Sequence, residues 1–330
     1  MSLDRVRLID LAASSGFRPE TLEKVDRLVG LLDDVGRHPL LSSVLALKGG
    51  TALNLGFGPP RRLSVDLDFN YVGAAGLEAM REERPAVEQA LERIARAQGF
   101  RVQRSKEEHA GAKYFLGYRS AFGSTDRVEI DLNYLHRVPL GPLVHLNLWR
   151  PDGAPGQGVR TVGVEELCAG KLCALLDRAL PRDCYDVIRL PTIAGERWNS
   201  RLRTLFIALA GTLARPLRDY GKERLAKVTQ VAIDEQLHPM LSGADRPSAE
   251  QLRRETWVVL APLLILTAAE LEYSEQLQVG ELRPELLFPD DDSQADLLRN
   301  HPALLWKVRS AKAGRAGRAT PRRRSRKNTR

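Results

Sequence analysis

The sequence contains few cysteines, and they do not form the pattern of a disulfide framework or a zinc site. Only Cys168, Cys173 and Cys184 occur in 330 residues. An odd number without framework spacing argues against a small disulfide-stabilised secreted domain. Because the three residues form no C-x-x-C pair and have no histidine nearby in the sequence, we expect buried free thiols.

Long hydrophobic runs are also missing. The longest apolar stretch, Trp257 to Leu266, is interrupted by Pro262 and is shorter than the roughly 20 apolar residues that cross a bilayer. The first ten residues include Asp4, Arg7 and Asp10 and lack the apolar core of a signal peptide. Hydrophobic residues make up 43% and charged residues 28%, which predicts a packed core. We therefore expect a cytoplasmic protein without membrane segments.

Acidic residues are absent from the last 24 positions, where 11 Lys and Arg residues occur. The rest of the chain has 39 of the 50 basic residues and all 42 acidic ones, a formal charge of −3 against +8 for the whole. Self-repulsion and the lack of core-forming residues predict a disordered basic tail over residues 311–330. Such a tail can bind a nucleic-acid backbone through salt-sensitive contacts, or it can serve only for solubility.

Hydrophobic periodicity predicts an α+β fold with strands in the N-terminal half and helices in the C-terminal half. The loop-rich stretch 139–158 separates a domain of residues 1–150 from a helical domain of residues 151–310. Strands are predicted at 63–71, 101–105, 113–119 and 127–134. Helices are predicted at 21–32, 51–55, 78–98, 164–180, 182–190, 202–213, 222–235 and 249–277, the last interrupted at Pro262.

The predicted strand over 63–71 carries two carboxylates on one face. Asp66 and Asp68 are two residues apart, so their side chains leave a strand on the same side. Paired carboxylates suit a divalent cation, and Mg²⁺ (or Mn²⁺) shares its oxygen ligands with substrate phosphates. Asp131 lies on the polar face of another predicted strand and could be a third metal ligand, or a charge that protects a sheet edge.

A glycine turn precedes this strand. Gly49 and Gly50 open a short predicted helix, and their missing side chains allow the backbone to approach a phosphate closely. The Thr51 hydroxyl could add a contact to the nucleotide. Each motif is weakly specific alone, but their close succession indicates a nucleotide-binding and metal-binding site.

The segments Lys48–Leu53 and Arg62–Phe69 resemble the signature of the AbiEii/MenT nucleotidyltransferase toxins of the DNA polymerase β-like superfamily. A second block, Glu166–Arg178 followed by Arg182–Val187, is similar to the lysine-bearing helix and Arg-Asp-x-x-Asp segment of that family. The resemblance implies a mixed-sheet nucleotidyltransferase core followed by a helical domain.

The resemblance also implies roles for individual residues. Ser64 and Asp66 would lie at the nucleotide and the metal, with Asp68 as the second metal ligand. Lys171 would bind the triphosphate, and Asp186 would complete the site as a metal ligand or by orienting the acceptor hydroxyl. Arg182 would add to the nucleotide-binding set. Without the resemblance, Lys171 and Arg182 could equally be a solvated helix residue and an ordinary ion-pair partner.

The implied activity is transfer of a nucleoside monophosphate from an NTP to the 3′ end of tRNA, which would block aminoacylation and growth. The implied partner is a cognate antitoxin. Nucleotidylation or phosphorylation of a protein hydroxyl, and a non-catalytic nucleic-acid-binding module, remain alternatives. The sequence predicts no oligomeric state.

Overall fold

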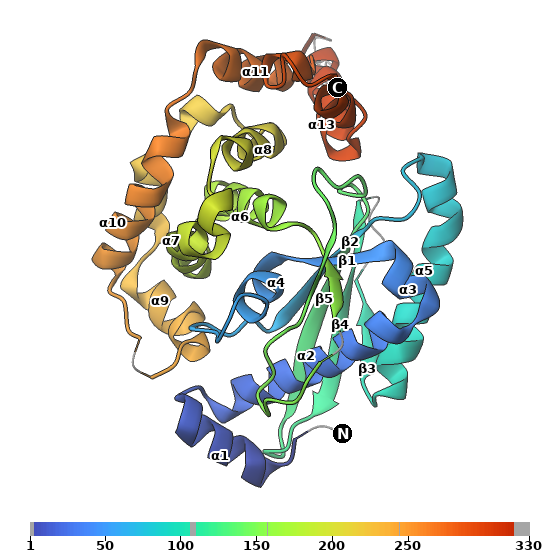
Figure 1. Ribbon diagram of the computed structural model, residues 1–330, viewed down its shortest axis with the longest axis vertical. Helices are drawn as coiled ribbons and strands as arrows, with labels where there is room; N and C mark the ends of the chain where they lie inside the picture. Colours follow the sequence, from blue (N-terminus) through green and yellow to red (C-terminus); the bar gives the residue numbers. More distant parts are fainter. Residues whose placement is uncertain (1–2, 106–109, 157, 244, 320–330) are drawn as a thin grey trace, which may run out of the picture.

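The computed structural model describes residues 3–105, 110–156, 158–243 and 245–319. Its centre is a seven-stranded mixed sheet with the order β3-β4-β5-β2-β1-β7-β6 (Figure 1). The strands are β1 Leu45–Lys48, β2 Asp66–Tyr71, β3 Arg101–Arg104, β4 Gly111–Arg119, β5 Thr125–Asn133, β6 Val144–Leu146 and β7 Val159–Thr161.

Strand β2 lies in the middle of the sheet, parallel to β5 and antiparallel to β1. The register pairs Asp68 with Asp131 of β5 and with Lys48 of β1. Paired residues of neighbouring strands project to the same face. The sheet thus gathers the polar side chains of three strands on one face, while Leu67 and Phe69 point into the core on the other.

The strand predicted over 63–71 begins in the structure at Asp66. The preceding residues pair with a distant segment, because Arg62 forms a β-bridge with Leu241 and Leu63 N–H donates to Met240 O. The alternating pattern of residues 63–71 is therefore real, but Leu63 at its start pairs with the helical part of the chain instead of the sheet.

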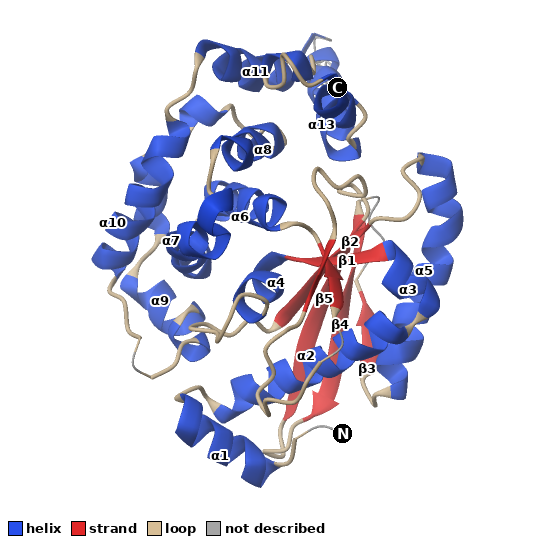
Figure 2. Ribbon diagram, in the orientation of Figure 1, coloured by secondary structure: helices blue, strands red, loops and turns tan. Residues whose placement is uncertain are grey.

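Helices cover both faces of the sheet (Figure 2). The face opposite the carboxylates carries α2, α3 and α5 (Figures 1 and 2). The apolar positions of α2 recur at helical spacing, and Leu22, Val25, Leu28 and Leu32 are buried. With the N-terminal helix, the bounds are α1 Arg5–Ser15, α2 Pro19–Arg37, α3 Pro39–Val44 and α5 Leu77–Ala97.

On the carboxylate side of the sheet lie the short helix α4, Gly49–Leu55, which packs on β1 and β2, and beyond it the C-terminal helices (Figure 1). These helices are α6 Val164–Arg178, α7 Pro181–Ala194, α8 Ser200–Ala210, α9 Gln230–Gln236, α10 Ala249–Leu260, α11 Ala268–Gln278, α12 Asp292–Arg299 and α13 Pro302–Ala319. Helices α6 and α7 both contact α4, so they lie directly over the glycine turn.

The predicted helices are largely confirmed in this lobe. Pro181 begins α7 as expected, because its fixed φ suits the first helical position. The break at Pro262 is also present, as a 3-10 turn between α10 and α11. The single helix predicted over 222–235 is wrong: a 3-10 turn over Lys222–Lys227 precedes α9, whose N-cap Thr229 accepts from Ala232 N–H.

Two sequence-based boundaries differ from the structure. Strand β7 lies beyond the predicted domain boundary at residue 150, yet it pairs with β1 in parallel, so the sheet extends across that boundary. Helix α13 runs to Ala319; the first nine residues of the predicted tail thus continue a helix, while residues 320–330 lie outside the described residues. Alanine, a strong helix former, recurs throughout 311–319.

Within the described ranges, no single helix is long and apolar enough to cross a bilayer. The pair α10 and α11 passes by length and composition only when taken together, and it is bent by 95°.

Candidate active site

The glycine turn packs directly against the strand that carries the carboxylates. Gly49 has a φ of 71°, and a Cβ there would lie 2.1 Å from Asp68 Oδ2. A Cβ on Gly50 would lie 2.9 Å from Ser64 Oγ. Both contacts are closer than real Cβ atoms reach, so the Asp68 or Ser64 side chain would have to shift, and at Gly49 the positive φ adds backbone strain. The two motifs, adjacent in the sequence, are thus one packed unit.

Thr51 and Ser64 have positioning roles in this structure. Thr51 is fully buried, and its Oγ1 donates to the backbone carbonyl of Asp66 at 2.5 Å. Ser64 is buried against Gly50. The direct hydroxyl contact expected between Thr51 and the nucleotide is therefore replaced by a bond that holds α4 on β2, next to Asp66.

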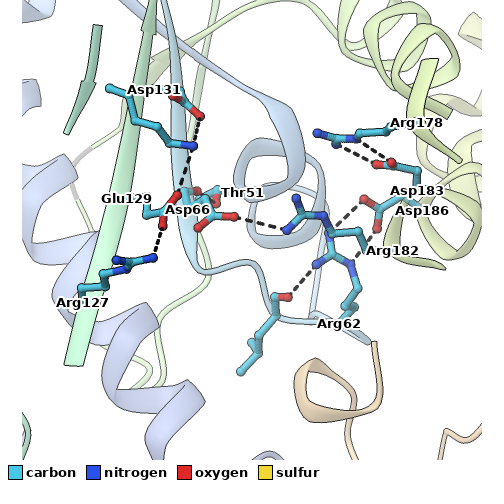
Figure 3. A network of polar contacts seen from close by, with 12 residues as sticks. Thr51, Arg62, Asp66, Arg127, Glu129, Asp131, Arg178, Arg182, Asp183 and Asp186 are labelled. Atoms are coloured by element: carbon cyan, nitrogen blue, oxygen red, sulfur yellow. Dashed lines mark hydrogen bonds and ion pairs between the residues drawn. The ribbon is translucent and has the colours of Figure 1, made fainter. Parts of the chain in front are cut away.

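Four carboxylates share the open face of β2 and β5, and Figure 3 shows Asp66, Glu129 and Asp131 among them. Asp66 and Asp68 are in register with Glu129 and Asp131. Burial raises the pKa of Asp66; Arg182 opposes this effect, whereas Asp68 and Glu129 add to it. Burial also raises the pKa of Asp131, against the influence of Lys113. Such crowding of negative charge disfavours ionisation unless a cation is nearby.

Two basic side chains of the protein, Lys113 and Arg182, lie close to these carboxylates. Lys113 Nζ lies 3.1 Å from Glu129 and 3.4 Å from Asp131. Arg182 Nη1 lies 3.4 Å from Asp66 Oδ2, and both side chains are partly exposed. Figure 3 shows Arg182 extending from the helical lobe toward Asp66. Arg182 is thus brought to the site as predicted, but it contacts a carboxylate of the metal pair.

Asp66 and Asp68 fit a divalent cation by chemistry. Both provide hard oxygen donors on one face, and neither is locked in a buried ion pair. Among the described residues, no group of three or more His, Cys, Asp or Glu side chains is arranged to hold a metal. Asp131 is on the correct face but is bound by Lys113. The protein thus offers a two-carboxylate donor set that substrate oxygens would complete.

Lys171 lies in a buried ionic network between α6 and α7. Its Nζ is 2.9 Å from Asp186 Oδ2 and 3.3 Å from Asp183 Oδ1. Arg178 forms a bidentate pair with Asp183, with distances of 2.7 and 2.9 Å. Burial would raise the pKa of Asp183, but Lys171 and Arg178 outweigh it and hold the pKa below its usual value. The network fixes the Lys171 ammonium at a defined point.

Asp186 is more deeply engaged than a metal ligand would be. Arg62 donates to both of its oxygens at 2.9 Å, and Asn54 Nδ2 donates to Oδ1 at 3.1 Å. Its side chain is 2% exposed. Burial opposes the charge, yet Arg62 and Lys171 lower the pKa of Asp186 far below its usual value. Asp186 is therefore ionised and fully occupied by protein donors.

A cavity of about 250 Å³ lies between the glycine turn, Asp68 and Lys171, and Asp66 and Arg182 are not among its lining residues. Its walls come from the end of β1, the glycine turn, β2 and α6, and include Lys48, Gly49, Gly50, Asp68, Asn70, His136, Glu166, Lys171 and Arg178. Asn70 Oδ1 is buried there without a hydrogen-bond partner among the described residues. A buried acceptor without a partner is costly and indicates a place for a ligand or water.

Several residues of the site have no role assigned from the sequence, among them Asn70, Glu129, Arg62 and Arg178. Asn70 and Glu129 stand on the polar faces of alternating strands, so the alternation itself could have indicated them. Arg62 and Arg178 are parts of the matched motifs, but their partners Asp186 and Asp183 become visible only in three dimensions.

Comparisons with known proteins agree with this geometry. A search of curated proteins gives no match. Among solved structures, the nucleotidyltransferase toxin MenT4 from Mycobacterium tuberculosis H37Rv superposes with a TM-score of 0.55 over 92% of this chain and 99% of its own, at 19% identity; this similarity supports the fold. The model of the nucleotidyl transferase AbiEii toxin family, type IV toxin–antitoxin system, matches residues 31–257, more than half of the chain. The chain therefore belongs to the AbiEii nucleotidyltransferase toxin family.

Proposed function

We propose that the protein transfers a nucleoside monophosphate from an NTP to the 3′-hydroxyl of a tRNA, with Mg²⁺ or Mn²⁺ as cofactor. In this reaction the acceptor oxygen bonds to the α-phosphorus, the bond to the β-phosphate oxygen breaks, and pyrophosphate leaves. The observation that carries the proposal is the single cavity in which the glycine turn and Asp68 meet Lys171 and Arg178.

Asp66 and Asp68 would hold the metal ion. The ion would supply positive charge to the phosphate oxygens of the reacting centre. In the structure, the Arg182 guanidinium lies 3.4 Å from Asp66 and supplies positive charge to that carboxylate. With a cation bound at Asp66, the Arg182 guanidinium would be available to the nucleotide phosphates.

Lys171 and Arg178 would bind the triphosphate. An ammonium group has three donors, and Asp183 and Asp186 take two of those of Lys171. Because Lys171 lines the cavity, its third donor is free to reach a phosphate oxygen. Asp186 then acts through Lys171, as a positioning residue that fixes the ammonium and pairs with Arg62. Thr51 and Ser64 hold the glycine turn and the carboxylate strand together.

Modification of the tRNA 3′ end would prevent aminoacylation and so arrest growth. Membership of a type IV toxin–antitoxin family implies that a cognate antitoxin opposes this effect. We place the activity in the cytoplasm, where NTP and tRNA are available. Residues 1–150 would supply the metal and glycine motifs, and residues 151–310 would supply Lys171, Arg178 and Arg182.

A labelling assay tests the proposal. The purified protein is incubated with each α-labelled NTP, Mg²⁺ and total tRNA, beside an Asp66→Asn variant. An Asp10→Asn variant is the matched control, because Asp10 is an exposed carboxylate on α1, outside the proposed site. We expect label on RNA with the wild type and with Asp10→Asn, and none with Asp66→Asn.

Two outcomes would contradict the proposal. Label on the protein instead of the RNA would show a protein hydroxyl as acceptor. No label with any NTP, together with growth inhibition no greater than that of Asp66→Asn on expression, would indicate a non-catalytic binding module.

A further inference from the structure

A second, larger cavity opens from the active-site cavity toward the C-terminal helix. Its volume is about 990 Å³, and it shares Lys48, His136, Cys173, Ala174 and Thr212 with the first. The two cavities are therefore adjacent along these shared residues, and we call the larger one the groove. Its far wall comes from α11 and α13, which do not line the active-site cavity, and from the segment after α8, of which Thr212 lines both cavities.

Trp306 of α13 lines this far wall and is 53% exposed. Among the described residues it is the only exposed Phe, Tyr or Trp side chain. Helix α13 packs on α11 and α12 through its opposite side, with Leu304 fully buried. The Trp306 ring thus lines the groove on a helix that is anchored in the core by other apolar residues. It offers a flat surface on which a ligand in the groove can stack.

The lining of the groove has one more basic than acidic side chain, a small excess that suits an anionic partner. Its basic lining residues are Lys48, at the inner end, and Lys307, whose Nζ donates to Leu213 O at 2.6 Å. Asp177 is the acidic side chain among the lining residues. Ser310 and Gln278 add neutral polar groups. Beyond the groove, α13 continues to Lys312, and the chain ends in the basic segment 320–330.

We propose that this groove binds the unpaired 3′ end of the acceptor RNA, with one base stacked on Trp306, so that the terminal hydroxyl reaches the catalytic cavity. Proteins that bind single strands combine a basic groove with aromatic side chains on which bases stack. A stacking wall near the end of the groove would hold the strand while Lys48 lies near its last phosphate. The inference rests on the proposed RNA acceptor but assigns a separate part of the molecule to it.

The test separates RNA binding from NTP binding by steady-state kinetics. The variants are Trp306→Ala, Trp306→Phe and Val258→Ala; Val258 is 68% exposed on α10 and does not line the groove, so it controls for the loss of a surface apolar group. Loss of one stacked base corresponds to roughly a tenfold loss of affinity. We expect Trp306→Ala to raise the KM for tRNA about tenfold with an unchanged KM for NTP, and Trp306→Phe to restore most of the affinity.

A binding measurement independent of catalysis completes the test. A short single-stranded RNA is titrated into the full-length protein while tryptophan fluorescence is recorded. We expect quenching in the wild type and in Val258→Ala, and its loss in Trp306→Phe, which keeps Trp149, Trp198 and Trp257. Equal quenching in Trp306→Phe, or a KM for tRNA in Trp306→Ala that matches Val258→Ala, overturns the inference.

The two proposals fail in different ways. RNA labelling by the wild type with no effect of Trp306→Ala on the KM would remove the groove and leave the function. Quenching that depends on Trp306, without any RNA labelling, would support the groove and contradict the proposed transfer. Quenching by a peptide from an antitoxin, but not by RNA, would assign the groove to a protein and overturn the inference.

Discussion

At the scale of single residues, the carboxylates of the site fall into two physical classes. Asp66 has a side chain that is 37% exposed and only a loose contact with Arg182, so it can exchange partners when a metal and a nucleotide arrive. Asp186 is 2% exposed and bound by Arg62 and Lys171, so it cannot. Equal loss of activity on mutating either residue would therefore have different causes.

Stability measurements distinguish the two classes. Asp186→Asn leaves Arg62 and Lys171 as buried cations with reduced compensation, and breaking a buried pair costs about 3–5 kcal/mol. Asp66→Asn removes a carboxylate that is crowded by Asp68 and Glu129, so we expect no loss in the free energy of unfolding. Denaturant titration of both variants measures this difference. Equal stability of the two would contradict the roles assigned here.

Glu166 provides a pH-dependent test of the cavity wall. Burial raises the pKa of Glu166 to about 7, although Leu140 N–H donates to its Oε2 at 2.8 Å and Lys48 is nearby. Because the folded-state pKa is above the unfolded one, the wild type loses stability as pH rises from about 4.5 to 7. Glu166→Gln keeps an acceptor for Leu140 but does not ionise. Relative to wild type, it should gain up to about 3 kcal/mol across this range.

Denaturation midpoints of wild type and Glu166→Gln at pH 5 and pH 8 check this expectation. The two proteins should be similar at pH 5, and the variant should be the more stable at pH 8. A constant difference at both pH values would show that Glu166 titrates normally.

At the scale of secondary-structure elements, the decisive unit is the junction of β1 and α4. Gly49 adopts a positive φ at the point where Asp68 occupies the space of a Cβ. Gly58 provides a matched position, since its φ is 88° and a Cβ there would meet no atom within 4 Å. The two glycines share backbone strain but differ in what surrounds them.

Gly49→Ala and Gly58→Ala should therefore differ more in transfer activity than in the backbone strain that each substitution introduces. Each substitution costs about 1 kcal/mol for a positive φ. Gly49→Ala also pushes Asp68 off the carboxylate face, so we expect transfer activity to be lost, whereas Gly58→Ala should keep it. The labelling assay and unfolding curves of both variants measure this. Comparable activity in both would indicate that the approach of Gly49 to Asp68 is unimportant.

Prediction from sequence succeeds for elements whose structure is determined by residues close to one another in the sequence. The alternation around Asp66 and Asp68, the glycines before α4 and the proline at the start of α7 each specify structure within a few residues. It fails where distant contacts decide. Residues 62–63 pair with the segment near Leu241 instead of extending β2, and Thr229 starts a new helix in a stretch whose apolar pattern suggests one helix.

The same distinction between local and distant determinants applies to the residues of the site. The metal pair and the glycine turn lie within 20 residues of one another, and the lysine helix is identifiable by resemblance. The pair Arg62–Asp186 joins residues 124 positions apart, and no local pattern indicates which buried cation meets which carboxylate. The unpartnered Asn70 and the Trp306 groove likewise depend on how the two halves of the chain are packed.

At the scale of the whole molecule, the proposed affinity for RNA would be divided between a groove and a charged end. The groove offers stacking on Trp306, which depends little on salt. Residues 320–330 contain six Arg and Lys residues, whose effect depends strongly on salt. The two contributions can be separated by changing ionic strength.

Truncation after Ala319 should reduce the slope of log KM for tRNA against log salt concentration, by up to about 0.7 for each RNA phosphate that the basic end neutralises. Trp306→Ala should raise the KM at every salt concentration without changing this slope. KM values for tRNA at several salt concentrations test both expectations. An unchanged slope after truncation would show that the basic end does not bind RNA.

The contact of Arg62 with Asp186, together with the bridge from Arg62 to Leu241, has a consequence for inhibition. Arg62, in the segment leading into the carboxylate strand, is bound by the helical lobe, so the relative position of the proposed metal ligands and of the proposed phosphate-binding Lys171 depends on this contact. An inhibitor therefore does not have to enter the cavity. A protein that inserts an acidic side chain beside Arg62 would compete with Asp186 and separate the carboxylate strand from the helical lobe. Transfer would stop although every catalytic group stays intact. Removal of that protein would restore the enzyme.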